Sequence, residues 1–240
     1  MVSETAQAPA HREARQTSSV GAAVIAGVMG CVLLGLGVPS LVTAVRTLDA
    51  RGVIWATYTG AAVPEKARLD AIADLGVLQR WGRDGELEGD AGLLLLRAGQ
   101  AAPTDAEREE RFAASAAAFG AALAVAPGQP NAWANLAYLH LHKGDTAAAV
   151  AALRMSMLSG SFVPALMASR IELGLRLLPV MDPETVGLLQ RQIRLTWTLD
   201  PDFVAKLSAR PGLAPLVRDA MDGLSEAEMA QYVRRHGGQK

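Results

Sequence analysis

The sequence predicts an all-α protein in which a single N-terminal transmembrane helix precedes an array of antiparallel helix pairs. Three observations predict this class. An uncharged apolar run near the N-terminus has the length of a membrane span. Aromatic residues make up only 5% of the 240 residues while alanine and leucine dominate, which favours helices over strands. Beyond the run, apolar residues recur three and four positions apart, as on the buried face of a helix.

The predicted transmembrane helix covers residues 20–46 and follows a polar tail, residues 1–19, that we expect to be disordered. No charge occurs from Val20 to Val38, a run that spans roughly 28 Å at about 1.5 Å per residue. A helix of a soluble core would show a polar stripe, and the apolar part of a cleaved signal peptide is shorter. A lipoprotein-type cleavage site before Cys31 is the alternative, but the strongly apolar residues that follow Cys31 argue against it.

The charges that flank this run do not decide its orientation by themselves. Arg12 and Arg15 precede the run and Arg46 and Arg51 follow it, so the positive-inside count is balanced. A single anchor behind a short tail is commonly a signal anchor. We therefore expect a single-pass protein of the inner (plasma) membrane whose helical domain lies outside the cytoplasm.

Small residues four positions apart occur within the same run. Ala23 pairs in this way with Gly27, and Ala26 with Gly30. Such spacing lets membrane helices approach closely, which predicts a homodimer through Ala23, Gly27 and Gly30. The alternative is that glycine and alanine are simply common in membrane helices.

The rest of the chain divides into a short linker and a helical domain. Residues 47–62 are predicted to be a juxtamembrane linker whose Trp55 and Tyr58 favour the membrane interface. The helical domain covers residues 63–240. Its helix starts are indicated by a proline or by capping residues at Pro64, Thr104–Glu107, Asp182 and Ser225–Glu228.

A glycine-rich segment interrupts the first helices of this domain. Gly82–Asp90 is predicted to be a polar turn. The following Ala91–Gln100 is too short to span a bilayer, so we expect it to be a buried helix.

The segment Pro127–Ser161 is the most informative part of the domain. It predicts two short helices joined by a tight turn at Lys143–Asp145. The segment resembles a tetratricopeptide repeat in its pattern of tryptophan, leucine, glycine, alanine and leucine at Trp133, Leu136, Gly144, Ala149 and Leu153. It departs from the repeat pattern at Ala137, His140, Ser156 and Ser161. Upstream, Phe119, Ala122 and Pro127 match the second half of such a repeat, so the resemblance covers about residues 90–161.

The resemblance implies a surface for binding another protein. In tetratricopeptide repeats the first helix of each pair lines a concave surface that holds peptide partners. Asn131, Asn135, Tyr138 and His142 are spaced by four, three and four positions, on the side opposite Trp133. The resemblance therefore implies that these four residues face a partner, and an ordinary solvated surface is the alternative.

Catalytic and metal chemistry are not predicted. The single cysteine excludes an internal disulfide framework and any multi-cysteine metal site, and the net charge of −1 gives no field for nucleic acid. We find no nucleophile elbow, phosphate loop or zinc-binding pair, so we expect no enzyme activity, no metal and no cofactor. His140 and His142 lie two positions apart and point to different sides of a helix, which predicts a structural role for His140. Four arginines could form a basic stripe for an anionic partner or an ordinary solvated face: Arg170, Arg176, Arg191 and Arg194.

Together these features predict a membrane-tethered scaffold or adaptor that binds a protein partner through a groove. The layout is similar to that of small tetratricopeptide-repeat proteins of bacterial exopolysaccharide and O-antigen assembly systems. Two alternatives remain open. One is an accessory subunit that stabilises a membrane enzyme or transport complex. The other is a receptor that faces the cytoplasm, as the mitochondrial import receptors with an N-terminal anchor do.

Overall fold

The computed structural model describes residues 24–38, 41, 48–78, 84–222, 224–227, 229–230 and 234. Over these residues the secondary structure is helical and contains no strand, which confirms the predicted all-α class. The predicted disordered tail, residues 1–19, lies outside the described residues.

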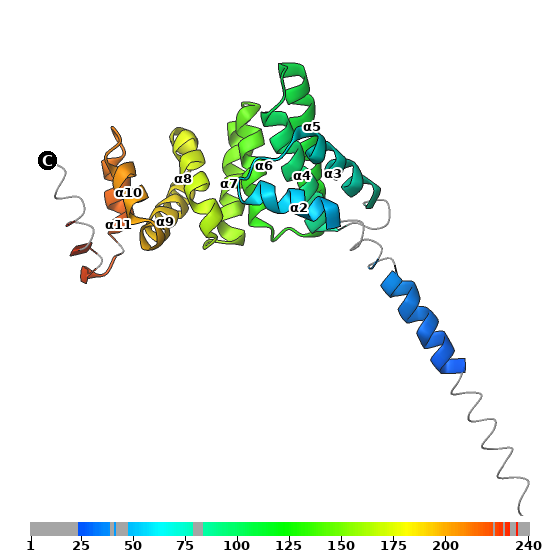
Figure 1. Ribbon diagram of the computed structural model, residues 1–240. Coiled ribbons are helices and arrows are strands. Elements are labelled where there is room, and N and C mark those ends of the chain that lie inside the picture. The colour runs from blue at the N-terminus through cyan, green and yellow to red at the C-terminus, as the bar shows by residue number, and fades with distance from the viewer. Residues whose placement is uncertain are drawn as a thin grey trace, which may run out of the picture.

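Residues 24–38 form a helix that stands away from the rest of the protein (Figure 1). Its apolar side chains are exposed, and Leu34 and Leu36 keep more than half of their surface. Within the described ranges, no helix combines the length and the hydropathy needed to cross a bilayer. Much of the predicted span, including Ala23 and residues 42–46, lies outside the described residues. Around Gly27 and Gly30 there is open space on this helix.

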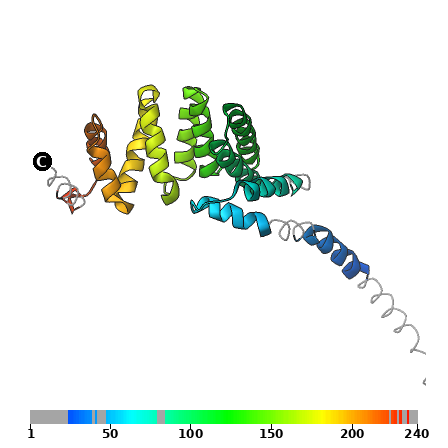
Figure 2. The same cartoon turned by 45° about the horizontal axis from the view of Figure 1, so that its top comes forward.

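The main body is a row of helices that pack side by side (Figure 1). Its elements, in chain order, are α2 (Leu48–Tyr58), α3 (Glu65–Leu78), α4 (Gly85–Gln100), α5 (Asp105–Val125), α6 (Pro130–His142), α7 (Thr146–Ser159), α8 (Pro164–Leu177), the short 3-10 helix η1 (Leu178–Val180), α9 (Pro183–Leu199), α10 (Pro201–Ser208) and α11 (Ala214–Met221). Three hairpins, α4–α5, α6–α7 and α8–α9, make up most of the row. Figure 2 shows them lined up, with α2 crossing beside the α4 to α6 part.

Five helices, α4, α5, α7, α9 and α10, begin at a capping side chain. Thr104 caps α5 by accepting a hydrogen bond from the Glu107 backbone N–H, and Asp182 accepts one from Thr185 at the start of α9. Both starts were predicted from the sequence. The tight turn between α6 and α7 is also present, and Gly144 adopts a φ of 83° there, a left-handed conformation that favours glycine.

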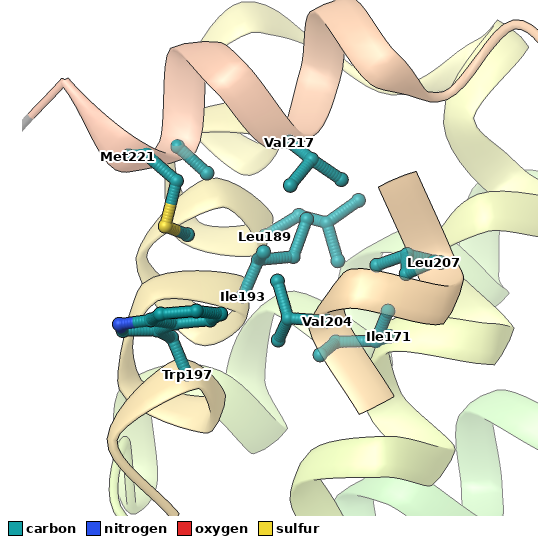
Figure 3. Packing of buried hydrophobic residues seen from close by; sticks show 9 residues of the cluster. Ile171, Leu189, Ile193, Trp197, Val204, Leu207, Val217 and Met221 are labelled. Carbon is teal, nitrogen blue, oxygen red and sulfur yellow. The ribbon is translucent and has the colours of Figure 1, made fainter. Parts of the chain in front are cut away.

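Each hairpin contributes to a continuous apolar core. Trp133 is half-buried and packs against the core of α4–α5 on one side and that of α7–α8 on the other. Its indole N–H donates to the Pro127 carbonyl at 2.8 Å, which fixes the loop before α6. The array continues past the end of the repeat resemblance. Figure 3 shows the last cluster, in which Ile171 of α8, Ile193 and Trp197 of α9 and residues of α10 and α11 close the row.

Two segments differ from the sequence prediction. Most of the predicted linker is helix α2, whose Ala50 and Ile54 are buried against Leu75 and Leu94 of α3 and α4. In addition, α4 begins at Gly85 rather than near Ala91, because Asp84 caps it by accepting from the backbone N–H of Glu86. Gly85 and Gly89, two of the glycines that suggested a turn, lie instead on the face of α4 where the end of α5 comes close.

This close approach generates a prediction with a matched control. A Cβ atom on Gly92 of α4 would lie 2.9 Å from ring carbons of Phe119, which is fully buried and has no room to move. Gly92→Ala should therefore destabilise the protein by about 1–2 kcal/mol in denaturant unfolding of the full chain in detergent. Gly120→Ala, in open space on α5, should instead stabilise it by up to about 1 kcal/mol. Equal effects of the two substitutions would contradict the packing of α4 on α5.

Candidate functional site

The first helices of the three hairpins enclose a groove with a volume of about 490 Å³. The α2 helix also lines this groove, with Thr57 and Tyr58. Its other lining residues come from α4, α6 and the α8 region: Leu93, Leu96, Arg97, Gln100, Pro130, Asn131, Ala134, Asn135, Tyr138, Val163, Ala165, Leu166, Ser169, Arg170 and Leu173. They combine an apolar floor with amide, hydroxyl and guanidinium groups.

Three of the four residues predicted to face a partner lie in this groove: Asn131, Asn135 and Tyr138. The steps of four and three positions place them on one face of α6. Asn135 donates to the Asn131 side-chain oxygen at 3.1 Å, so the two amides form a continuous polar strip. Tyr138 is half-buried, and its ring stands edge-on to Phe112 with centroids 6.3 Å apart. Tyr138 therefore belongs partly to the core as well as to the groove.

His142, the fourth predicted residue, lies elsewhere. Its Nε2 atom is 2.9 Å from Glu109 Oε1, and its ring stands edge-on to Phe112 at 4.7 Å. Together with the half-buried His140 it lines a different cavity of about 330 Å³ between α5 and α6. The reason is the length of α5: its 21 residues extend beside the last turn of α6, where they supply partners for His142.

Tyr58 of α2 anchors the polar strip from outside the three hairpins. Its hydroxyl donates to Asp90 Oδ1 at 3.1 Å and accepts from the Asn131 amide at 3.2 Å. Burial of the hydroxyl and the adjacent Asp90 carboxylate raise the pKa of Tyr58 to about 12. Burial likewise raises the pKa of the Asp90 carboxyl. Tyr58 thus holds α2 on α4 and α6, whereas the sequence suggested a role at the membrane interface for it. Trp55, one turn earlier, is 72% exposed.

Arg170 is the most deeply buried charge in the described part of the chain, with 1% of its surface exposed. Its guanidinium donates to the carbonyl oxygens of Ser156 and Gly160, to the Ser156 hydroxyl and to Gln192 Oε1, at distances of 2.6–3.1 Å. All four acceptors are neutral, and burial lowers the pKa of Arg170 to about 10. It forms the back of the groove where α7, α8 and α9 meet.

The four arginines suggested as a basic stripe are not gathered on one surface. Arg170 is buried, and Arg194 donates to the Ala220 carbonyl at 3.1 Å on the far side of α9. Arg191 lines a separate small cavity and Arg176 is exposed. Of the four, only Arg170 contributes to the groove.

Sequence reasoning missed Arg97, Tyr58 and the role of Arg170. For Arg97 a signal was present, because Leu93, Arg97 and Gln100 repeat on α4 the steps of four and three that identified the strip on α6. For Tyr58 and Arg170 the decisive contacts come from other helices.

The described residues contain no group of three histidine, cysteine, aspartate or glutamate side chains that could hold a metal ion. No family model matches the chain, and neither a curated protein nor a solved structure matches it significantly. The fold and the groove are thus the basis for assigning a function.

The hydrogen bonds of Arg170 generate a stability prediction. Arg170→Met would keep most of the volume but remove the guanidinium donors of the Gly160 carbonyl and of Gln192 Oε1. Since each such loss costs about 1–3 kcal/mol, the free energy of unfolding should fall by at least about 3 kcal/mol. The control Arg176→Met, at an exposed position of the same helix, should change it by less than about 0.5 kcal/mol. Similar values for both variants would show that Arg170 does not hold α8 in place.

Proposed function

We propose that the protein is a membrane-tethered scaffold or adaptor that binds a segment of another protein in the groove formed by α4, α6 and α8. The observation that carries this proposal is the combination of side chains in the groove. Asn131 and Asn135 offer amides that suit a peptide backbone, and Leu93, Leu96 and Leu166 offer surfaces for apolar side chains. The lining residues include no histidine, cysteine, aspartate or glutamate, which suits recognition better than acid–base or nucleophilic catalysis.

The repeat resemblance supports the same proposal. A tetratricopeptide-like array presents the first helix of each pair to its partner. Here α4, α6 and α8 are the first helices of their hairpins, and all three line the groove. The partner-facing residues that we retain are Asn131, Asn135 and Tyr138.

The tether is part of the proposal. The uncharged run from Val20 to Val38 and the exposed apolar side chains of the helix at 24–38 support a transmembrane helix over residues 20–46. With this helix as a signal anchor in the inner (plasma) membrane, the helical domain lies outside the cytoplasm. Contact between two copies through Ala23, Gly27 and Gly30 would make it a homodimer. The similar layout of polysaccharide-assembly proteins favours a place in cell-envelope assembly.

One observation favours the second candidate, an accessory subunit of a membrane enzyme or transport complex. Tyr58 already satisfies the Asn131 amide, and Asn131 in turn accepts from Asn135. The amides of Asn131 and Asn135 are thus already hydrogen-bonded within the chain, so they do not need a separate ligand. A receptor facing the cytoplasm is the third candidate. It differs from the first candidate in the side of the membrane on which the helical domain lies.

The membrane assignment predicts two results for the cellular protein. After an alkaline carbonate wash the full chain should stay in the membrane pellet, because nearly every residue of the run from Val20 to Val38 favours lipid. Protease added outside spheroplasts should digest the part beyond about residue 50. Release into the supernatant would remove the anchor, and protection from protease would support the receptor that faces the cytoplasm.

The groove predicts a position-specific crosslink. A photo-crosslinking amino acid at Ser169, which lines the groove, should give a discrete adduct in living cells. The same group at Ala168, which is exposed but does not line the groove, should not. Ala165→Trp, which fills the groove from its exposed wall, should reduce the adduct at least tenfold, whereas Ala168→Trp should leave it unchanged.

Two results would speak against the groove. Equal adducts from positions 168 and 169, or an adduct that Ala165→Trp does not diminish, would show that the contact lies elsewhere. The accessory-subunit candidate would then lead.

A further inference from the structure

The groove continues past Tyr58 into a second hollow of opposite charge. This hollow has a volume of about 590 Å³ and shares Tyr58, Pro130 and Asn131 with the first. Its charged lining residues are all acidic: Asp84, Glu86 and Asp90. The charged lining residues of the first hollow are all basic: Arg97 and Arg170. Tyr58 and Asn131 lie at the join between the two.

The change of sign follows one face of α4. Glu86, Asp90, Leu93, Arg97 and Gln100 are separated by four, three, four and three positions, so they point to the same side of the helix. Asp90 and Arg97 are seven positions apart, which is two helical turns or about 10 Å along the axis. A single helix therefore presents a negative group to one hollow and a positive group to the other, at a fixed separation.

These charges are largely unneutralised within the described part of the chain. The Arg97 guanidinium donates to the neutral Gln100 Oε1 at 3.0 Å, and Arg170 donates to neutral acceptors alone. On the acidic side, Asp90 accepts from the neutral Tyr58 hydroxyl. Arg51 of α2 exerts only a weak attraction on Asp90, since burial of that carboxyl outweighs it. Asp90 is half-buried, and a half-buried charge without a counter-ion attracts an opposite charge more strongly than a solvated one does.

We propose that the groove and the acidic hollow together bind an extended segment of a partner protein that carries both charges: a basic side chain placed against Asp90 and an acidic side chain placed against the exposed Arg97. This inference rests on the proposed function and adds the chemistry of the partner to it. A strand rises about 3.3 Å per residue, so a separation of about 10 Å corresponds to three residues of the segment. Asn131 lies at the join of the two hollows and Asn135 lies beside it, so their amides can meet the backbone that an extended segment leaves free.

The test is a selection of displayed random peptides on the full-length protein in lipid nanodiscs. The parent should enrich peptides with one basic and one acidic residue about three positions apart. Asp90→Asn keeps an oxygen that can accept from Tyr58, and it should abolish only the basic preference. Arg97→Gln changes an exposed side chain, and it should reduce only the acidic preference. For one selected peptide, each substitution should weaken binding about tenfold, while Arg176→Gln, outside the groove, should leave the affinity unchanged.

The groove-filling Ala165→Trp variant separates this inference from the proposed function. Two results would overturn the charge assignment but leave the groove as a binding site, provided that Ala165→Trp still excludes the selected peptides. In one, the selected peptides show no charge preference. In the other, the charge preference is the same in the parent, in Asp90→Asn and in Arg97→Gln. Peptides that still bind Ala165→Trp, or a selection that enriches none, would overturn both.

Discussion

The buried guanidinium of Arg170 is the interaction on which the groove most depends. It joins the end of α7, the turn into α8 and the middle of α9 by donating to the Ser156 and Gly160 carbonyls and to Gln192. A cation inside a protein is costly unless its donors are satisfied, and here neutral oxygens replace the lost water. The same contacts fix α8 against α6 through Ser156, whose hydroxyl donates to the Pro130 carbonyl at 2.6 Å. The position of one wall of the groove relative to the next is therefore set by a polar network and not only by apolar packing.

The fold could be predicted from the sequence where local signals and packing agree. The hairpin of α6 and α7 carries a helical period and a tight turn at Lys143–Asp145, and the structure has both of them. The start of α4 and the whole of α2 could not be predicted in this way. Gly85 and Gly89 suggested a turn because the use of these glycines, the close approach of Ala122 at the end of α5, depends on another helix. The α2 helix buries a narrow face that consists of Ala50, Ile54 and the polar Thr57, which leaves little apolar periodicity in its sequence.

The groove residues also divide into those that the sequence predicts and those that depend on contacts with other helices. Spacing along α6 identified Asn131, Asn135 and Tyr138, because residues on one helix face are fixed by the helical period alone. The period does not reveal which neighbour a side chain meets, so His142 was grouped with them although Glu109 and Phe112 of α5 hold it elsewhere. Arg170 was placed with surface arginines because charged side chains are almost always solvated. Its burial follows from carbonyl groups that become available only once α7 has ended beside it.

The segment nearest the predicted membrane span takes part in the site. The described helix at 24–38 and α2 are separated only by residues 39–47, and α2 brings Tyr58 to the join of the two hollows. The Tyr58 hydroxyl contacts Asp90 on the acidic side and Asn131 in the polar strip. A segment that occupies both hollows has to pass this side chain. The geometry of the groove thus depends on the docking of α2, which follows the described helix at 24–38 in the chain.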